Sequence, residues 1–120
     1  MKKTVYLVED NFEISELIDY LLTDINVDVR MFTTIAGFKK ELHQLPSPDL
    51  IILDIMLPDG NGIDICREMK TDKHTRAIPV ILMSAHINIK TKALESAADG
   101  FISKPFDIND FMATVEKYVA

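Results

Sequence analysis

Five short apolar runs, each followed by a more polar segment, constrain the fold of this chain more than any other feature. The runs lie at 4–8, 27–32, 50–53, 80–83 and 100–103. Each has the length of a strand, and a continuous rather than alternating apolar pattern predicts burial on both faces of a sheet. Strands that alternate with helices favour parallel pairing through right-handed crossovers. We therefore expect an α/β fold, a doubly wound parallel sheet with helices on both faces.

The segments between the runs carry apolar residues three or four positions apart, which is the spacing of amphipathic helices. Residues that favour helix N-termini precede several of them, namely Asp10-Asn11, Thr33 or Thr34, and Asp107 with Asp110 three positions on. We expect five helices, of which the fourth, over 89–97, has the thinnest apolar stripe. The stripes open at Ile14, Ile35, Ile63, Ile89 and Ile108.

The composition limits the classes of partner. The chain has 120 residues, which suits one domain, and its 13 Lys and Arg against 19 Asp and Glu give a net charge of −6. An acidic surface disfavours direct binding to nucleic acid or to anionic lipid. Cys66 is the only cysteine, and no signal peptide or apolar span is evident. We expect a soluble cytoplasmic protein with no membrane contact.

Polar residues follow four of the five apolar runs. Glu9-Asp10 follows the first run, Asp54 the third, Ser84 the fourth and Lys104 the fifth. Open parallel sheets bind ligands beyond the carboxyl ends of their strands. Taken singly, these residues could be helix caps, a turn aspartate and a solvated lysine. Because they follow four strands in succession, we expect three carboxylates, a hydroxyl and an ammonium at one rim.

Such a cluster has a defined chemistry. Two carboxylates about 4 Å apart repel by roughly 4 kcal/mol at an effective dielectric of 20, so three of them require a compensating cation. Carboxylate oxygens without His or thiolate ligands suit Mg²⁺. A carboxylate such as Asp54 is also a competent nucleophile, and Ser84 and Lys104 are suited to hold the oxygens of a phosphoryl group.

Four motifs, in this order and spacing, resemble the receiver domain of two-component response regulators of the chemotaxis-regulator type. They are VEDN (8–11), LDIMLPDGNG (53–62), VILMSAH (80–86) and DGFISKPF (99–106). The resemblance covers the whole chain, so we expect residues 1–120 to be one receiver domain with no output domain. The N-terminal Met favours a stand-alone protein over an excised piece. The resemblance implies five strands in the order 2-1-3-4-5.

The resemblance also implies a phosphoacceptor and a metal site. Asp54 would take a phosphoryl group from a phosphohistidine on a sensor histidine kinase or a histidine phosphotransfer protein. Glu9, Asp10, Asp54 and the backbone carbonyl of Met56 would bind Mg²⁺. A chain of this kind is a signalling phosphoacceptor that promotes its own phosphorylation and dephosphorylation, and it has no separate substrate.

A switch follows from the same resemblance. Ser84 is the expected switch hydroxyl, Lys104 contacts the phosphoryl group, and Phe101 is the expected switch aromatic. Phosphorylation would repack the face formed by the fourth helix, the fifth strand and the fifth helix, which a downstream effector or a second copy of the chain would bind. The family usually has a cis Lys–Pro bond before the position of Pro105.

Two positions are expected to tune hydrolysis of the acyl phosphate. They are Met56, two residues after the acceptor, and His86, two after the hydroxyl. Met56 offers no hydrogen bond to an attacking water, so we expect slower dephosphorylation than with a polar residue. The glycines at 60 and 62, with Pro58, match a turn that needs positive φ or close backbone approach.

The sequence departs from the family pattern at four positions. Glu9 stands where Asp is more frequent, and its extra methylene extends the reach of the carboxylate. Ser84 replaces the commoner Thr, and Phe101 lacks the hydroxyl of the frequent Tyr, so switching would rely on ring packing. Ala97 stands where many members have glycine, and we expect Gly100 to supply the unusual backbone angle instead.

Other classes fit less well. A metal-dependent nuclease or topoisomerase-like module and a haloacid-dehalogenase-type phosphatase both require a second acid two residues after Asp54, where Met56 stands. A flavodoxin-like phosphate loop needs donors after the first strand, and Glu9-Asp10 repels anions instead. The remaining alternative is a pseudo-receiver that serves as a docking module without phosphorylation. The kinase, the output and the oligomeric state are not encoded in any motif.

Overall fold

A computed structural model of the chain describes residues 2–44, 46–85 and 97–119. The strands of its main sheet are β1 (Thr4–Val8), β2 (Asp28–Phe32), β3 (Leu50–Asp54), β6 (Val80–Ser84) and β7 (Gly100–Ser103). A small hairpin of β4 (Met56–Leu57) and β5 (Gly60–Asn61) follows β3. The helices are α1 (Phe12–Asp24), α2 (Ile35–Leu42), α3 (Gly62–Thr71) and α5 (Ile108–Val119).

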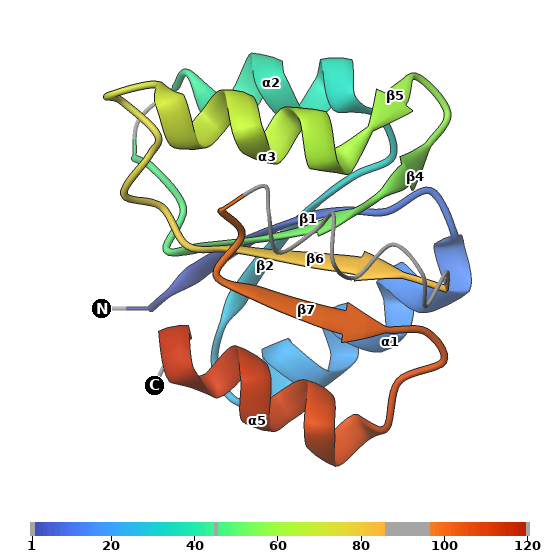
Figure 1. The fold of residues 1–120 in the computed structure, drawn as a ribbon. Coiled ribbons are helices and arrows are strands. Elements are labelled where there is room, and N and C mark those ends of the chain that lie inside the picture. Colours follow the sequence, from blue (N-terminus) through green and yellow to red (C-terminus); the bar gives the residue numbers. More distant parts are fainter. Residues whose placement is uncertain (1, 45, 86–96, 120) are drawn as a thin grey trace.

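The main sheet lies between two layers of helices (Figure 1). Its strand order is β2-β1-β3-β6-β7, and all four pairings are parallel. β6 and β7 are the fourth and fifth of the predicted strands, because the labels β4 and β5 belong to the small hairpin. The observed order is therefore the predicted order 2-1-3-4-5. The expected doubly wound fold is therefore confirmed. The predicted fourth helix falls at 89–97, and residues 86–96 lie outside the described part of the chain.

The core has one apolar cluster on each face of the sheet. α2 and α3 cover one face and α1 and α5 cover the other (Figure 1). The central strands β1, β3 and β6 contribute to both clusters, as their continuous apolar runs predicted. The expectation of burial on both faces is wrong for β2, in which Asp28, Arg30 and Met31 are exposed, and for β7, which is buried only at Ile102. Both are edge strands, with a neighbour on one side only.

The predicted helix N-termini are confirmed, and the structure selects Thr34 rather than Thr33. The Asn11 side chain accepts a hydrogen bond from the Ile14 amide at 3.1 Å, and Thr34 accepts from the Gly37 amide at 3.1 Å. Asp107 accepts from the Asp110 amide at 3.1 Å. Each cap of this type contributes about 1 kcal/mol, because it satisfies an amide that the helix itself leaves without an acceptor.

The unusual backbone angle near the start of β7 lies at Ala97 and not at Gly100. Ala97 has φ of 67°, and none of the glycines in the described ranges has positive φ. The expectation that Gly100 would take over this angle is therefore wrong. An alanine in this region carries a steric cost of about 1–2 kcal/mol, because its Cβ approaches the following carbonyl oxygen.

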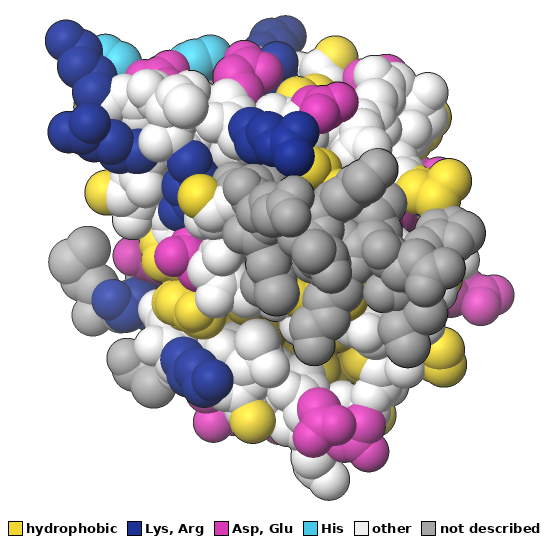
Figure 2. Space-filling model, viewed as in Figure 1, with side chains coloured by type: hydrophobic (Ala, Val, Ile, Leu, Met, Phe, Trp, Pro, Cys, Tyr) yellow, Lys and Arg dark blue, Asp and Glu magenta, His cyan; other side chains and the backbone are white. Residues whose placement is uncertain are grey.

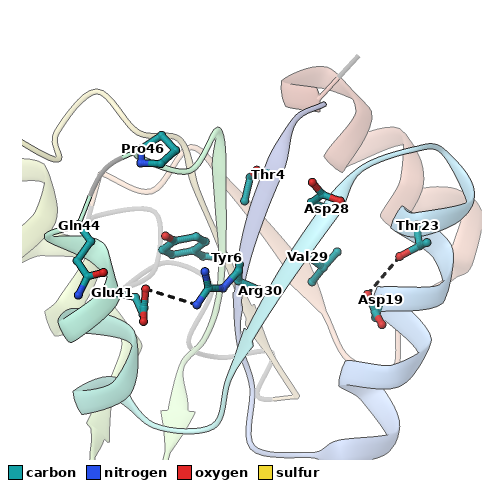
Figure 3. Close-up of a pocket in the computed structure, with 10 residues that line it drawn as sticks. All are labelled: Thr4, Tyr6, Asp19, Thr23, Asp28, Val29, Arg30, Glu41, Gln44 and Pro46. Atoms are coloured by element: carbon teal, nitrogen blue, oxygen red, sulfur yellow. Dashed lines mark hydrogen bonds and ion pairs between the residues drawn. The ribbon is translucent and has the colours of Figure 1, made fainter. Parts of the chain in front are cut away.

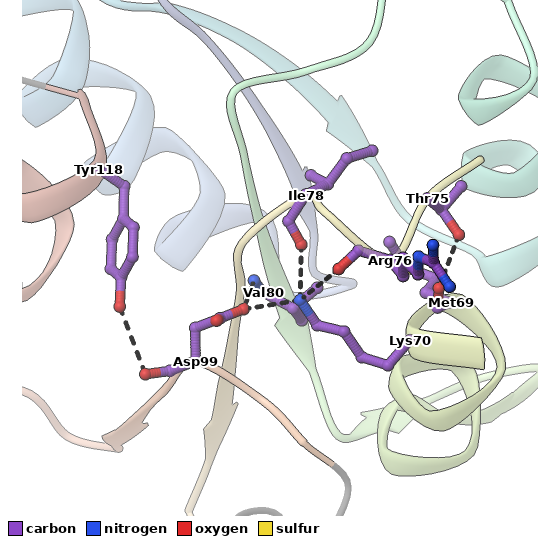
Figure 4. Close-up of polar contacts among 8 residues, drawn as sticks. All are labelled: Met69, Lys70, Thr75, Arg76, Ile78, Val80, Asp99 and Tyr118. Carbon is purple, nitrogen blue, oxygen red and sulfur yellow. Dashed lines mark hydrogen bonds and ion pairs between the residues drawn. The ribbon is translucent and has the colours of Figure 1, made fainter. Parts of the chain in front are cut away.

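A half-buried lysine ties α3, β6, β7 and α5 together at the amino ends of the strands, opposite the predicted site (Figure 4). Lys70 Nζ lies 2.8 Å from Asp99 Oδ2 and 2.8 Å from the Ile78 carbonyl oxygen. The same Asp99 oxygen accepts from the Val80 amide at 2.7 Å. The Tyr118 hydroxyl donates to the Asp99 carbonyl at 3.3 Å. One carboxylate therefore holds the starts of two neighbouring strands.

Replacing Asp99 by Ala should lower the free energy of unfolding by about 2 kcal/mol, because the Val80 amide and the Lys70 ammonium lose their shared acceptor. Urea denaturation measures this change. Glu68→Ala is the matched control, since it breaks the exposed Lys39–Glu68 ion pair and should change stability by less than about 0.5 kcal/mol. Equal losses in the two variants would contradict the role given to Asp99.

The surface carries charges of both signs. On the face shown in Figure 2, acidic and basic side chains are interspersed. Among the described residues, no helix combines the length and the apolar character needed to cross a membrane.

Candidate functional site

The carboxyl ends of β1, β3, β6 and β7 carry the polar residues that the sequence singles out. Glu9 directly follows β1, and Lys104 directly follows β7. Asp54 is the last residue of β3 and Ser84 the last of β6. β1 pairs with β3 up to Leu53, and Asp54 pairs with Met83, one residue before Ser84. The strand register therefore brings these ends together at one rim.

The three predicted acids form one cluster. Glu9, Asp10 and Asp54 each offer a carboxylate oxygen, and these oxygens all lie within 4.8 Å of one another. Glu9 is 1% exposed and Asp54 5% exposed, whereas Asp10 is exposed. At such a separation each pair of carboxylates repels by roughly 3 kcal/mol at an effective dielectric of 20. The cluster needs positive charge, and its exposed side at Asp10 is open to solvent.

Lys104 supplies positive charge to two of these acids. Its Nζ forms an ion pair with Glu9 Oε1 and lies 3.2 Å from Asp54 Oδ2. Burial lowers the pKa of Lys104, but the hydrogen bond to Glu9 and the charges of Asp54 and Glu9 outweigh it, and the pKa is raised. The lysine is therefore held as an ammonium. Its contact with Glu9 was not predicted from the sequence.

Backbone contacts fix both ends of this ion pair. The Glu9 amide donates to the Phe32 carbonyl at 2.9 Å, and Glu9 Oε2 accepts from the Asn11 amide at 3.1 Å. The Lys104 amide donates to the Ser84 carbonyl at 2.9 Å. The Lys104–Pro105 peptide bond is cis, as the family resemblance implied. The acid and the lysine thus both belong to the ordered rim.

In the turn after Asp54, close packing against backbone requires glycine at position 62, and contact with a side-chain end favours it at position 60. A Cβ at Gly62 would lie 2.3 Å from the Asp54 carbonyl oxygen, and a Cβ at Gly60 would lie 2.7 Å from Ile35 Cδ1. Neither glycine has positive φ. The sequence analysis offered two reasons for these glycines, positive φ and close approach of neighbouring atoms, and the structure supports the second. The backbone of Asp54 is therefore packed directly against the start of α3.

The remaining predicted residues are placed as follows. Ser84 is buried, with 2% exposure, and Phe101 is half-buried against the core cluster on the α2 and α3 face. The Met56 side chain is 59% exposed at the start of the small hairpin. His86 lies outside the described residues. The functional roles of these four residues stay predictions.

The sequence analysis missed one polar contact of the β4–β5 hairpin that follows Asp54. The Asp59 carboxylate accepts hydrogen bonds from the Ile35 amide at 2.8 Å and the Ala36 amide at 3.0 Å, at the N-terminus of α2. These two backbone hydrogen bonds lower the pKa of Asp59. The only sequence signal was an acid in a proline-containing turn, and that pattern does not reveal a partner 24 positions away.

The donor set of the cluster fits a hard divalent cation. Its ligand atoms are carboxylate oxygens, and no His or Cys of the described chain belongs to it. Oxygen ligands of this kind suit Mg²⁺ better than zinc or copper. The exposed position of Asp10 leaves room for the water ligands that Mg²⁺ usually retains.

A separate hollow of about 490 Å³ lies at the edge of the sheet (Figure 3). Residues of β1, β2, α1 and the end of α2 line it, and the Arg30–Glu41 ion pair of 3.4 Å crosses part of it. None of the acids of the rim borders it. The hollow therefore adds nothing to the chemistry of the cluster.

The sequence matches the response regulator receiver domain family over residues 5–116. Among curated relatives, the phosphate regulon transcriptional regulatory protein PhoB of Escherichia coli strain K12 is 31% identical over 118 residues, which cover 97% of this chain and 51% of PhoB. The chain spans about half the length of the regulators of this type that it matches.

Solved structures give the same assignment. A signal receiver domain of a signal transduction histidine kinase from Syntrophus aciditrophicus superposes with a TM-score of 0.88 at 28% identity, over 98% of this chain and 89% of that one. The phosphorylated cyanobacterial phytochrome response regulator RcpA superposes with a TM-score of 0.84 at 25% identity, over 98% of this chain and 91% of that one. The fold is therefore shared with a receiver domain from a histidine kinase and with a response regulator.

Proposed function

This chain belongs to the response regulator receiver domain family, and from that premise we propose that it is a phosphoacceptor of a two-component phosphorelay in which Asp54 takes the phosphoryl group. The observation that carries the proposal is the buried Asp54 carboxylate, which lies among two further acids and beside the Lys104 ammonium. The description of RcpA as phosphorylated supports the same chemistry.

The transfer is a displacement at phosphorus. An Asp54 oxygen attacks the phosphorus of a phosphohistidine, the phosphorus–nitrogen bond breaks, and the imidazole nitrogen keeps the electron pair. Lys104, now 3.2 Å from Asp54 Oδ2, then pairs with a phosphoryl oxygen. A Mg²⁺ held by Glu9, Asp10, Asp54 and the Met56 carbonyl would offset the negative charge that gathers on the phosphoryl oxygens.

The proposed output is a switch at β7 and α5. The phosphoryl oxygens on Asp54 draw the Ser84 hydroxyl toward them, and Phe101 repacks in the space that this movement changes. Phe101 is half-buried, so core packing holds only part of this residue. The face formed by the predicted fourth helix, β7 and α5 is then bound by a downstream effector or by a second copy of the chain.

The proposed partners follow from this chemistry. The donor is a sensor histidine kinase or a histidine phosphotransfer protein, and the exchange takes place in the cytoplasm. Residues 1–120 act as one receiver domain, and the chain serves as a signalling phosphoacceptor without a separate substrate. His86, two residues after Ser84, is a proposed tuning position for hydrolysis.

Replacing Met56 by Asn should speed the loss of the phosphoryl group from Asp54. The Met56 side chain is 59% exposed beside the acceptor and has no group that orients an attacking water, whereas an amide has both a donor and an acceptor. Decay of the phosphorylated protein, followed by intact mass after removal of the donor, measures the rate. Equal decay of Met56→Asn and wild type would contradict this role.

The proposed function is tested with a small phosphodonor. The chain is incubated with acetyl phosphate and Mg²⁺, and the modified residue is located by mass spectrometry after reduction with borohydride. We expect one modification, at Asp54, that EDTA prevents. An unmodified chain would favour the docking module that works without phosphorylation, and modification at another residue would refute Asp54 as the acceptor.

A further inference from the structure

We propose that Asp59 is a positioning residue for the cation site: by capping α2 it holds the β4–β5 hairpin, which carries Met56, in place beside Asp54. The inference rests on the proposed function, because the cation site is part of it. Asp59 is not itself a member of the acid cluster of Glu9, Asp10 and Asp54. Its effect on the cation would pass through the backbone of the hairpin.

The hairpin is too small to hold its shape alone. Each strand has two residues, Met56 pairs with Asn61, and Leu57 pairs with Gly60. Pro58 and Asp59 form the turn, and neither has the positive φ of the tight turns that best match strand twist. Isolated hairpins are marginally stable even when they are longer. The position of Met56 therefore depends on contacts between the hairpin and its surroundings.

Asp59 makes a charged contact of this kind, between the hairpin and α2. Its two carboxylate oxygens accept separate hydrogen bonds, from the Ile35 amide at 2.8 Å and from the Ala36 amide at 3.0 Å. Hydrogen bonds from amides to a carboxylate at a helix N-terminus are stronger than those between neutral groups, and the helix dipole adds to them. The lowered pKa of Asp59 agrees with this contact. The tip of the hairpin is therefore fastened to α2.

The helix that receives this contact is a firm support. Ile35, Phe38 and Leu42 are buried in the core cluster on the α2 and α3 face. Gly60 lies so close to Ile35 that a Cβ would come within 2.7 Å of Ile35 Cδ1, and Leu57 packs against the same cluster. The polar contact of Asp59 and the apolar contacts of Leu57 and Gly60 therefore fix the hairpin against α2 and the core cluster beneath it.

The other end of the hairpin reaches the acid cluster. Asp54 and Met56 are separated by one residue, and the Gly62 amide closes the hairpin on the Ile55 carbonyl at 2.8 Å. A movement at the tip would shift Met56 relative to Asp54. Outer contacts that orient metal ligands typically contribute about 10-fold to 100-fold in metal affinity. Loss of the Asp59 contact should therefore weaken cation binding without removing a ligand.

Mg²⁺ affinity of the Asp59→Ala variant, measured by isothermal titration calorimetry, tests the proposal. We expect the dissociation constant to rise about tenfold, the lower end of the range for such contacts. Thr34→Ala is the matched control, because Thr34 caps the same helix through the Gly37 amide but does not belong to the hairpin. Asp64→Asn controls for the lost charge, since Asp64 is an exposed acid at the start of α3. Both controls should bind Mg²⁺ within about twofold of wild type.

Amide hydrogen exchange in EDTA gives a second readout that requires no metal. The Gly62 amide, which closes the hairpin, should exchange faster in Asp59→Ala than in wild type and should be unchanged in Thr34→Ala. Asp59→Asn, which keeps one acceptor oxygen, should restore part of both properties. Wild type that binds no Mg²⁺ would overturn the cation site and this proposal together. Wild type that binds Mg²⁺ no better than Asp59→Ala, or equal losses in Thr34→Ala, would overturn this proposal alone.

Discussion

Replacement of Asp54 by Asn should abolish the uptake of a phosphoryl group from acetyl phosphate. The amide has no anionic oxygen to attack phosphorus, and the other buried acid of the cluster, Glu9, is held in its ion pair with Lys104. The substitution is nearly isosteric, and Lys104 keeps its ion pair with Glu9. Intact mass spectrometry, with circular dichroism to confirm folding, measures the loss.

The two other acids provide the comparison. Asp10→Asn and Glu9→Gln remove proposed cation ligands but leave the proposed acceptor in place. Both should reduce the rate of modification and should raise the Mg²⁺ concentration that it requires, while the modification still occurs at Asp54. Uptake by Asp54→Asn at a rate near that of wild type would show that another residue is the acceptor.

Much of the fold was predictable because the buried strands have a strong local signal. The runs that contain Ile52 and Ile81 are apolar at every position, and the run that contains Val5 departs from this only at Thr4. Their three strands are buried on both faces. The run at 27–32 is interrupted by Asp28 and Arg30, and β2 lies at the edge of the sheet, where Arg30 and Met31 are exposed. Apolar content within a segment does not reveal how many neighbours the strand has.

The members of the candidate site were predictable, but their contacts were not. In a parallel sheet all carboxyl ends lie on one side, so residues after successive strands must approach one another. The Lys104–Glu9 ion pair joins residues 95 positions apart, and Asp59 contacts a helix 24 positions before it. Spacing along the chain cannot indicate which of several acids a long side chain reaches.

Ala97 illustrates a different limit. The φ of 67° at Ala97 belongs to a turn that precedes β7, and glycine is the residue that sequence reasoning associates with such an angle. The chain has a glycine nearby, Gly100, but that residue lies in a strand with an ordinary backbone. The positive φ therefore falls on Ala97, three residues before the glycine to which residue type alone would assign it.

In the proposed function, the contacts of Lys104 would differ with and without a phosphoryl group on Asp54. Without a phosphoryl group, the Lys104 ammonium contacts the carboxylates of both Glu9 and Asp54 and compensates part of their negative charge. A phosphoryl group on Asp54 would compete with Glu9 for the same ammonium. Glu9 is 1% exposed, so water cannot stabilise its carboxylate once Lys104 turns to the phosphoryl group. A bound cation would then be the main source of compensating positive charge for Glu9. Phosphorylation and cation binding should therefore support each other through Lys104.

Replacement of Lys104 by Met should lower the free energy of unfolding in EDTA by about 3 kcal/mol, because removal of one partner leaves buried Glu9 and Asp54 without their counter-ion. The same change should strengthen Mg²⁺ binding, since the ion no longer competes with an ammonium for these carboxylates. Saturating Mg²⁺ should therefore restore much of the lost stability. Urea denaturation in EDTA and in Mg²⁺ measures both effects.

The pH dependence of this loss follows from the raised pKa of Lys104. A group whose pKa is higher in the folded state contributes its full stabilisation below its ordinary value, here 10.5, and loses it as pH rises through the folded-state value. The difference between wild type and Lys104→Met should thus be constant near neutral pH and should shrink in strong alkali. Lys39→Met, which breaks an exposed pair, should lose less than about 0.5 kcal/mol. A Lys104→Met variant as stable as wild type in EDTA would mean that the acids do not depend on this lysine.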